Sequence, residues 1–483
     1  MKKNLLVGFA VALGLTASAV QAEDLLQVFD LAAQNDPLIR EAEATRDANK
    51  QARPQALGAL LPQLSASGNL GRAESKSISS QTQVVNDQLV SFDNGGRNTT
   101  DNTGWNLNLR QSVFSYANWT ALRTANHSVA QAEADFMAAQ QSLAQRVAQQ
   151  YFAVLAAADD VDALESSREA IQRQLDQSER RFEVGLIAIT DVQEARAARD
   201  QAAAQVIASK RILASSLEQL RATIGVKPDV LKKPQDNMPL ASPQPADEDA
   251  WVNMSMEQNA TLISSRLAAD IARDGVSTSF SGHLPTLDLT ASRSYSDADS
   301  TRELTTGVNS GTRLPNSSTS NNTNIGLQLN LPLFSGGTTQ SRVKESQYRW
   351  IAAKERLERT SRQTEQQARD AYLGVMSEIT RVQALQQAVQ SNQTALQAAE
   401  AGYEVGTRTT VDVLNARRNL IQAQTAYSQA RYSYINNQVQ LRLAAGNLDR
   451  SMIEEINRAL LVDAPVGNTA RAPTPVATPP AQN

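Results

Sequence analysis

The residues best placed for ion-pair and hydrogen-bond chemistry lie near the C-terminal end of the chain. Arg408 and Asp412 stand four residues apart there, just after the glycines Gly402 and Gly406. On a helix, an arginine and an aspartate at this spacing share a face and can form a weak ion pair. Because two glycines interrupt a region of otherwise helical composition, the stretch is typical of the tip of a helical hairpin.

A second stretch, around Gly185, has a similar pattern and indicates an internal duplication. The separation between matching landmarks is 220 to 223 residues for Pro62 with Pro285, Phe114 with Phe334, and Gly185 with Gly406. So little drift predicts an internal repeat. The expected organisation is a signal peptide (1–22), a first repeat (23–230), a linker (231–250), a second repeat (251–461) and a disordered, Pro/Ala-rich tail (462–483).

Each repeat is expected to contain a helix, two strands and a long helical hairpin. The first arms of the hairpins are predicted at about 117–182 and 338–400, because both segments lack proline and are rich in helix-forming residues; the first also keeps a heptad-like apolar face. About 65 residues at 1.5 Å rise make a helix of roughly 100 Å, which is typical of coiled-coil packing. The other expected helices are 24–57, 191–223, 254–276 and a return helix that ends near 445.

Alternation of apolar and polar residues predicts the strands. Two are clear, 105–114 and 325–331, and two weaker ones begin near residues 64 and 287. The segments 74–103 and 297–322 are rich in Ser, Asn, Asp and Thr and are expected to be exposed loops. Four strands cannot close a membrane barrel, since the smallest known have eight. A chain of this kind would have to oligomerise to cover its sheet edges, a dimer giving eight strands and a trimer twelve.

The N-terminal residues have the composition of a secretory signal peptide. Lys2 and Lys3 precede an apolar run that ends in Val20-Gln21-Ala22, with small residues at the −3 and −1 positions of a cleavage site. Loss of the two lysines takes the formal net charge from −4 to −6, which argues against nucleic acid as a partner. No later segment has the roughly 18 continuous apolar residues of a transmembrane helix. A membrane crossing would therefore require strands closed into a barrel.

Motifs for catalysis or cofactor binding are absent from the sequence. It has no cysteine, no phosphate-binding Gly-x-x-x-x-Gly-Lys-Ser/Thr loop, no His-Glu-x-x-His and no Gly-x-Ser-x-Gly. The two histidines, His127 and His283, fall on different elements and are expected to be structural or exposed, so we expect no metal site, no cofactor and no enzymatic activity. From the residues alone, two classes stay open: an export duct, and a periplasmic or surface coiled-coil structural protein.

Five ordered motifs resemble a known family. They are Leu-Pro-Gln-Leu (61–64), Arg-Gln-Leu-Asp-Gln (173–177), Val-Gly-Leu-Ile-Ala-Ile-Thr-Asp-Val-Gln (184–193), Gly-His-Leu-Pro-Thr-Leu-Asp-Leu-Thr-Ala (282–291) and Gly-Thr-Arg-Thr-Thr-Val-Asp-Val-Leu (406–414). With them, roughly residues 23–460 resemble the TolC-type outer-membrane factors of efflux and type I secretion systems. The resemblance implies an α+β membrane protein without catalytic activity. It would be a homotrimer whose twelve-stranded β-barrel in the outer membrane continues as an α-helical coiled-coil barrel through the periplasm.

The same resemblance implies partners and roles for single residues. The partners are outer-membrane lipid, a periplasmic adaptor (membrane fusion) protein, and an inner-membrane efflux pump or ABC exporter. Thr190, Asp191, Tyr403 and Arg408 match positions that tie the tips together and keep the tunnel shut. Arg408 can pair with Asp191 within or between protomers, and the Tyr403 hydroxyl can donate to a carboxylate. Exposed ion pairs are worth only about 0–1 kcal/mol each, which suits a gate that must open.

Two further sets of tip residues follow from the resemblance. Asp412 matches one acidic position of a constriction ring, which attracts cations, whereas Asn415 stands where the family has a second acid. This departure halves the charge of the ring. The residues expected to contact the adaptor are Gly185, Leu186, Gly406 and Thr407.

Overall fold

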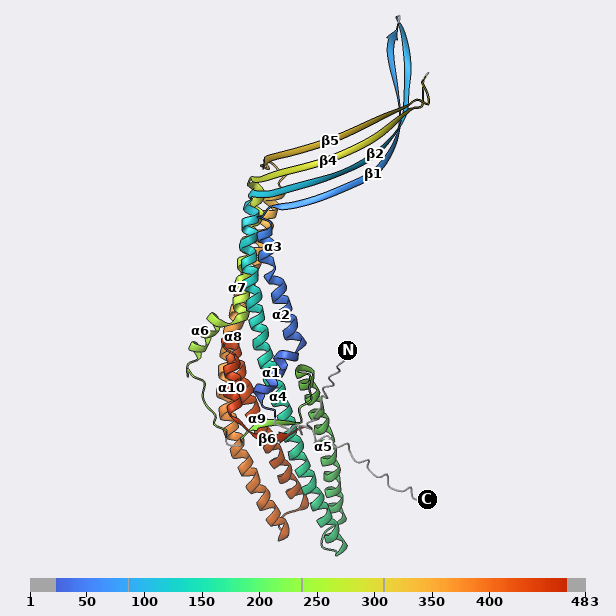
Figure 1. Ribbon diagram of the computed structural model, residues 1–483. Helices are drawn as coiled ribbons and strands as arrows, with labels where there is room; N and C mark the ends of the chain where they lie inside the picture. Colours follow the sequence, from blue (N-terminus) through green and yellow to red (C-terminus); the bar gives the residue numbers. More distant parts are fainter. Residues whose placement is uncertain (1–22, 86, 236–237, 307–308, 467–483) are drawn as a thin grey trace, which may run out of the picture. The chain divides into compact units, whose positions relative to one another are not determined.

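The structure, a computed structural model, describes residues 23–85, 87–235, 238–306 and 309–466, which divide into two compact units. The hairpin unit comprises residues up to 45, 134–263 and 359 onward, and the sheet unit comprises 46–133 and 264–358. Figure 1 shows the elements of both units, and helices α4 and α8 contribute residues to each of them. The predicted signal peptide lies outside the described residues.

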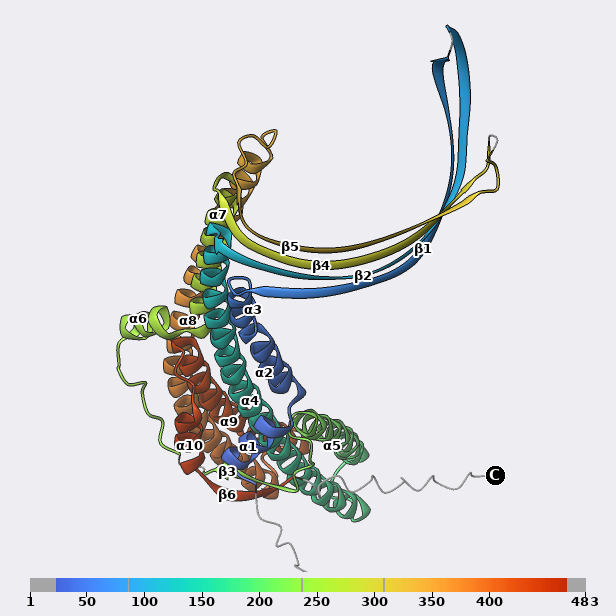
Figure 2. The same ribbon diagram turned by 45° about the horizontal axis from the view of Figure 1, so that its top comes forward.

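The sheet unit contains four long strands in the order β1-β2-β4-β5, each antiparallel to its neighbour. Figure 2 shows them as one curved layer. Strands β1 and β5 lie at the edges, so each has one side without a partner in this sheet. The strands are β1 (Gln63–Val85), β2 (Gln88–Phe114), β4 (Thr286–Leu304) and β5 (Arg313–Asn330).

The loops expected at 74–103 and 297–322 are wrong, because most of these residues continue the strands. Pairing between β1 and β2 runs unbroken from Gln63 opposite Arg110 to Val85 opposite Gln88. Along β5, nearly every side chain is exposed on both faces of the sheet. A strand without a buried face does not need apolar residues at every second position, and its backbone hydrogen bonds hold it in place. Alternation could therefore not reveal it.

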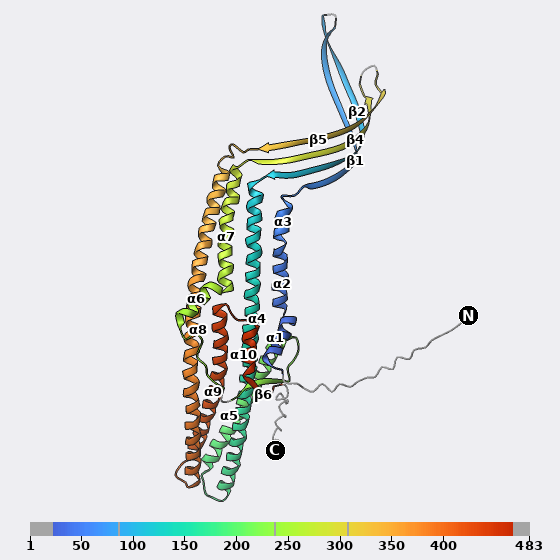
Figure 3. The ribbon, with the colours of Figure 1, turned by 60° about the vertical axis from the view of Figure 1, so that its left-hand side comes forward.

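Two long helical hairpins dominate the hairpin unit. The first joins α4 (Tyr116–Glu183) to α5 (Ile189–Ile224), and the second joins α8 (Thr338–Glu404) to α9 (Thr410–Ala445). These bounds agree with the predicted hairpins to within a few residues. Figure 3 shows the two tips side by side. In α4 the core side chains Val147, Tyr151 and Leu155 recur every four residues and are fully buried, as the apolar periodicity predicts.

The shorter helices are interrupted where the sequence predicts continuous ones. The first is broken at Asp36 and at Gln51, and the break at Asp36 is extended because it precedes Pro37. The expected helix 254–276 is likewise divided, at the extended residue Asn259. The segments are α1 (Leu25–Asn35), α2 (Pro37–Lys50), α3 (Ala52–Gly58), α6 (Glu248–Gln258), α7 (Ala260–Phe280), and the 3₁₀ turn η1 (Ser281–His283).

A small second sheet was not predicted. Strand β3 (Val230–Pro234) pairs antiparallel with β6 (Leu460–Pro465), which follows the short helix α10 (Arg450–Arg458). The expected linker 231–250 is therefore partly regular, and the expected disordered tail cannot begin at residue 462, although residues 467–483 lie outside the described ranges. The two strands are short and far apart in sequence, so no local pattern announces their pairing.

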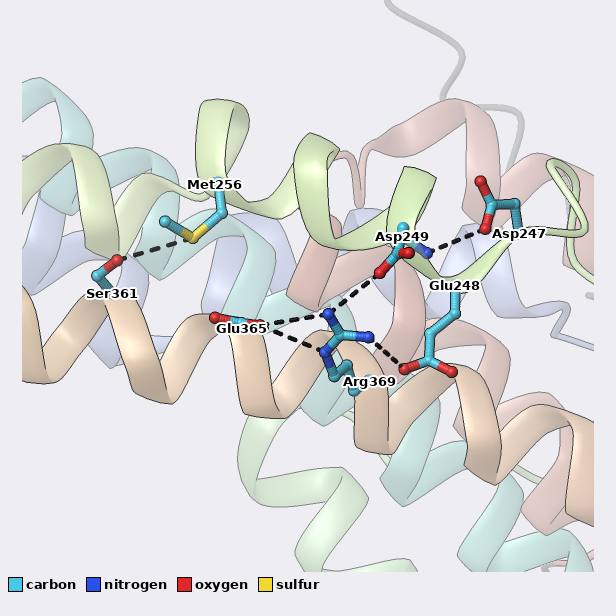
Figure 4. Close-up of polar contacts among 7 residues, drawn as sticks. All are labelled: Asp247, Glu248, Asp249, Met256, Ser361, Glu365 and Arg369. Atoms are coloured by element: carbon cyan, nitrogen blue, oxygen red, sulfur yellow. Dashed lines mark hydrogen bonds and ion pairs between the residues drawn. The ribbon is translucent and has the colours of Figure 1, made fainter.

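Helix α6 is held against α8 by one arginine. Arg369 on α8 reaches between two acidic residues of α6, with Glu248 at 2.7 Å and Asp249 at 3.1 Å, as Figure 4 shows. Glu365, one turn before it on α8, lies 3.3 Å away. At the other end of α6, the hydroxyl of Ser361 donates to the sulfur of Met256 over 3.8 Å.

Candidate functional site at the hairpin tips

Both hairpin tips use the same backbone turn. Gly185 and Gly406 have φ angles of 76° and 77°, a left-handed conformation that strains any residue with a Cβ atom. At each tip the glycine and the residue after it donate backbone N–H groups to carbonyl oxygens of the last helical turn. The bonds are Gly185 to Phe182 (2.9 Å), Leu186 to Arg181 (2.9 Å), Gly406 to Tyr403 (3.2 Å) and Thr407 to Gly402 (2.8 Å). The glycines thus have a structural role in ending the helices.

Tyr403 is buried where the two hairpins meet, with 7% of its surface exposed. Its ring belongs to a small apolar cluster with Leu396 and Val413 of its own hairpin. The guanidinium carbon of Arg181, from the end of α4, lies 4.7 Å from the ring centroid. A cation this close to an aromatic face is attracted by the ring quadrupole. Arg181 therefore links the first tip to the second.

Sequence reasoning missed Arg181, although the repeat contains a signal for it. Its equivalent in the second repeat is Gly402, at the separation of 221 residues that also relates Gly185 to Gly406. A large cation in one copy and a glycine in the other mark a position where the two tips differ. That asymmetry could have identified Arg181 as a residue of the contact.

The hydroxyl of Tyr403 has no hydrogen-bond partner among the described residues, although it is shielded from solvent. The expected bond to a carboxylate is therefore not made within this single chain. A buried hydroxyl without a partner costs about 1–3 kcal/mol. A donor or acceptor from outside the chain would remove that cost.

Arg408 is exposed and lies before α9, which begins at Thr410. The alternative of an i,i+4 pair between Arg408 and Asp412 on one helix is therefore wrong, and no ion pair joins the two within the described chain. Gly402 makes room for the arginine stem, because a Cβ atom on Gly402 would lie only 2.7 Å from the Cγ atom of Arg408.

Thr190 and Asp191 lie in the first turn of α5 at the other tip. Thr190 is exposed, Asp191 is half-buried, and the backbone N–H of Asp191 donates to the carbonyl of Ala188 over 3.2 Å. Neither side chain makes a hydrogen bond or ion pair with Arg408 in the part of the chain that the structure describes. The four predicted gate residues thus lie at the tips, and Tyr403 contacts the opposite hairpin through Arg181.

Asp412 closes the N-terminus of α9 in a reciprocal cap with Thr409. The Thr409 backbone N–H and hydroxyl donate to one Asp412 oxygen over 2.9 and 3.0 Å, and the Asp412 N–H donates to the Thr409 hydroxyl over 3.3 Å. The bonds from the Thr409 backbone and side chain, with a smaller effect of Arg408, hold the pKa of Asp412 below its usual value. This carboxylate therefore stays charged at neutral pH.

Asn415 is exposed on α9 and lines a groove of about 870 Å³ between α9 and the first hairpin. Glu194, which occupies the equivalent position of the first repeat, lines the same groove from α5, and Arg418 is its basic member. The groove thus places an acid of the first repeat on the same surface as the amide at the equivalent position of the second.

The outermost tip residues are open to solvent. Leu186 is 72% exposed, and its apolar neighbour Val184 and the corresponding Val405 are exposed to a similar degree. A Cβ atom placed on Gly185 or Gly406 would meet no atom of the chain within 4 Å. Exposed apolar side chains next to bare backbone are a suitable surface for a protein partner.

The two histidines belong to the sheet unit. His127 on α4 approaches the buried carboxylate of Asp274 on α7, with 3.6 Å between Nε2 and Oδ2, and His283 packs near the ring of Phe280. In the described ranges, no three His, Cys, Asp or Glu side chains are placed to hold a metal ion. None of the helices in those ranges is long and apolar enough to cross a membrane.

Comparison with known proteins assigns the family. The family described as "Outer membrane efflux protein" matches residues 28–226 and 251–447. The outer membrane protein TolC of Escherichia coli strain K12 is 35% identical over 465 residues, 95% of this chain and 90% of that protein. The alkaline protease secretion protein AprF of Pseudomonas aeruginosa is 28% identical over 432 residues, 89% of this chain and 86% of that protein.

The fold agrees with this result. The crystal structure of the Campylobacter jejuni CmeC outer membrane channel superposes with a TM-score of 0.68 at 20% identity, covering 90% of this chain and 89% of that one. The helix-rich architecture with few strands is therefore shared with a solved channel. With a family match over most of its length and a relative at 35% identity, the chain belongs to the outer membrane efflux protein family.

Proposed function

We propose that this protein forms a homotrimeric exit duct for efflux or type I secretion, closed at its hairpin tips. An outer-membrane location and a role in transport follow from the family, which consists of channels rather than enzymes. The trimer and the gate go beyond the family assignment and are the part that we propose here. One observation carries the proposal: the four-stranded sheet has two unpaired edges, and the large apolar side chains of its edge strands β1 and β5 are exposed.

The exposed apolar residues fit a lipid-facing surface. Ile325, Leu327 and Leu329 alternate along β5 and are 76%, 67% and 66% exposed, while the residues between them are polar or glycine. Water disfavours such a stripe by roughly 25 cal/mol for each Å² of apolar surface. Outer-membrane lipid would cover the face that carries the apolar residues, and a water-filled lumen would solvate the face that carries the polar ones.

The edges of the sheet fit a ring of identical chains. Because each neighbouring pair in the order β1-β2-β4-β5 is antiparallel, β1 and β5 run in opposite directions. Strand β5 of one copy can therefore pair antiparallel with β1 of the next, which is the head-to-tail contact that closes a cyclic oligomer. Three copies give twelve strands, above the minimum of eight for a membrane barrel.

Three copies would also complete the gate. Arg408 and Asp191 lack a partner for an ion pair within the described chain, and the Tyr403 hydroxyl is buried without a hydrogen bond. In a ring, Arg408 of one copy can reach Asp191 or Thr190 of its neighbour. Asp412 would form a threefold ring of carboxylates at the constriction, with Asn415 contributing no charge.

The tips would receive the periplasmic adaptor. Gly185, Leu186, Gly406 and Thr407 form the exposed end of both hairpins, and the adaptor would join them to an inner-membrane efflux pump or ABC exporter. The relative AprF, named for secretion of an alkaline protease, supports protein export as one use. The relative TolC supports the outer-membrane location.

The proposal is tested by reconstitution and export together. We expect the mature protein to extract only with detergent, to have the mass of three chains by native mass spectrometry, and to form small, mostly closed channels in planar bilayers. In a strain that lacks its outer-membrane efflux protein, it should restore drug or protease export. A water-soluble filament without conductance would show instead a coiled-coil structural protein.

A further inference from the structure

Glu23 is built into the small sheet of the hairpin unit. Its backbone nitrogen donates to the carbonyl of Val230 over 2.9 Å, and its carbonyl accepts from the N–H of Lys232 over 3.2 Å. These bonds make Glu23 a one-residue parallel bridge beside Leu231. The hydroxyl of Tyr151 on α4 lies 3.3 Å from the same Glu23 carbonyl. The position of the Glu23 nitrogen is thus fixed by β3.

Within the ranges that the structure describes, no cation pairs with the side chain of Glu23. Its Oε2 atom is shielded from solvent and has no hydrogen-bond partner among the described residues. Burial, with a further contribution from the carboxylate of Asp229, raises the pKa of the Glu23 carboxyl. The carboxylates of Glu23 and Asp229 therefore repel each other at a place where burial already disfavours negative charge.

The other charged groups around Glu23 are engaged elsewhere or lie on the strands. The carboxylate of Asp24 accepts the Gln27 N–H over 2.8 Å and caps α1. The ammonium group of Lys233 pairs with Asp159 on α4 over 3.1 Å. Lys232 and Asp463 occupy paired positions on β3 and β6. No ion pair to Glu23 or Asp229 is formed within the described residues.

We propose that cleavage of the peptide bond between Ala22 and Glu23 supplies the missing positive charge at this site. A peptidase adds water across the bond, which leaves a carboxylate on Ala22 and an amine on Glu23. A free α-amine has a pKa of about 7.7–8.0, so it is protonated at neutral pH. One of its N–H groups keeps the bond to Val230, and the other two become donors for the carboxylates of Glu23 and Asp229.

The processed end then stabilises the junction of three distant segments. The small sheet joins the start of the mature chain to β3 and to β6 near its end, and α4 contributes Tyr151. An ammonium group that gains carboxylate partners on folding has a raised pKa. Its stabilisation is therefore fully present below pH 8 and is lost as the pH rises through the raised value.

The test compares the mature chain with one that carries Gly-Ser between Ala22 and Glu23, each with and without Asp229→Asn. Mass spectrometry first identifies the N-terminal residue, and the thermal midpoint of the detergent-solubilised protein is then followed from pH 6 to pH 11. We expect the thermal midpoint of the extended chain to be a few degrees lower than that of the mature chain at pH 7. This difference in midpoint should vanish by pH 11, and Asp229→Asn should make it smaller at pH 7.

Asp463→Asn is the matched control, because this aspartate lies on the neighbouring strand and should shift both chains equally. A difference that persists unchanged to pH 11 would show a steric effect of the extension and overturn the proposal. Equal midpoints at pH 7, or a mature chain that begins at a residue other than Glu23, would overturn it as well. None of these results depends on the gate or on the number of chains in the oligomer.

Discussion

Arg181 lies over the ring of Tyr403, with 4.7 Å between its guanidinium carbon and the ring centroid. This contact joins the first hairpin to the second inside one chain. Arg408 and Asp191 differ from it, because they form no ion pair within the described residues, and the pairing that we propose for them is with a neighbouring copy. A gate at the tips would then have two kinds of tie, one that holds the hairpins of a chain together and one that holds the chains together.

Loss of Arg181 should loosen the closed state. A cation–π contact is worth about 0.5–2 kcal/mol, so Arg181→Gln should raise the ratio of open to closed channels by about 2- to 30-fold. Single-channel recording in planar bilayers measures this directly. Arg180→Gln is the matched control, since Arg180 is the neighbouring exposed arginine. Equal conductance of the Arg181 and Arg180 variants would remove the contact from the gate.

The ring and the hydroxyl of Tyr403 can be separated by substitution. Tyr403→Phe keeps the face over which Arg181 lies and removes only the hydroxyl, which has no partner within the described chain. If the contact between Arg181 and the ring keeps the channel closed, Tyr403→Phe should conduct nearly like the parent, and Tyr403→Ala should have a higher conductance. If both variants open equally, the hydroxyl must bond to a neighbouring chain, and the cation–π contact is secondary.

The tie between chains can be tested by exchanging charges. Arg408→Asp or Asp191→Arg alone should raise conductance, because each places like charges opposite each other. The double exchange restores an opposite pair and should lower conductance again. Single-channel recording of all three variants decides the question. A double variant that opens as far as the two single effects together would show that these residues do not face each other.

The long helices could be predicted to within a few residues, whereas each of the four long strands could be predicted only at one of its ends. In α4, buried residues such as Val147 and Tyr151 create a clear periodicity over many turns. In the sheet, side chains such as Leu70 and Ile78 of β1 remain exposed in the single chain, so burial imposes no pattern on the polar segments. Those strands depend on backbone pairing with the next strand along the chain and, between β2 and β4, with a strand distant in sequence.

The candidate site was predicted in position but not in its contacts. The glycines of the tips could be predicted from the motifs because each has a local reason, a left-handed turn. The approach of Arg181 to Tyr403 depends on how two hairpins more than 200 residues apart in sequence pack, which no local pattern records. The role of Asp412 as a cap was also missed, although Thr409 three residues earlier is the usual signal.

The constriction ring leads to a prediction about cation block. Asn415→Asp would double the acidic groups of the proposed ring, so block by divalent cations should strengthen at least tenfold in apparent affinity. In the parent, block should persist to a lower pH than an ordinary aspartate would allow, because the pKa of Asp412 is held below its usual value. Channel current titrated with a divalent cation at several pH values measures both effects.

The control for that experiment must preserve the helix cap. Asp412→Asn removes the charge but retains an oxygen that can accept from Thr409, whereas Asp412→Ala also loses the cap at a cost of about 1 kcal/mol. Block should disappear in both variants if the charge matters. Unchanged block in Asp412→Asn would place the cation site elsewhere.

A buried acid on α7 makes a prediction about stability. Asp274 is 1% exposed and its Oδ1 atom lies 2.8 Å from Nε of Arg123 on α4, whose side chain is half-exposed. Removing the arginine leaves a buried carboxylate without its cation, whereas removing the acid leaves an arginine that water can still reach. Arg123→Met should therefore destabilise the protein by about 3–5 kcal/mol, and Asp274→Asn by clearly less. Denaturation of the detergent-solubilised protein measures the free energy of unfolding of both variants.

His127→Gln is the control, because the Nε2 atom of His127 is 3.6 Å from the acid, so its loss should change the free energy of unfolding little. If Asp274→Asn costs as much as Arg123→Met, desolvation of the acid does not dominate, and the hydrogen bonds of this cluster do.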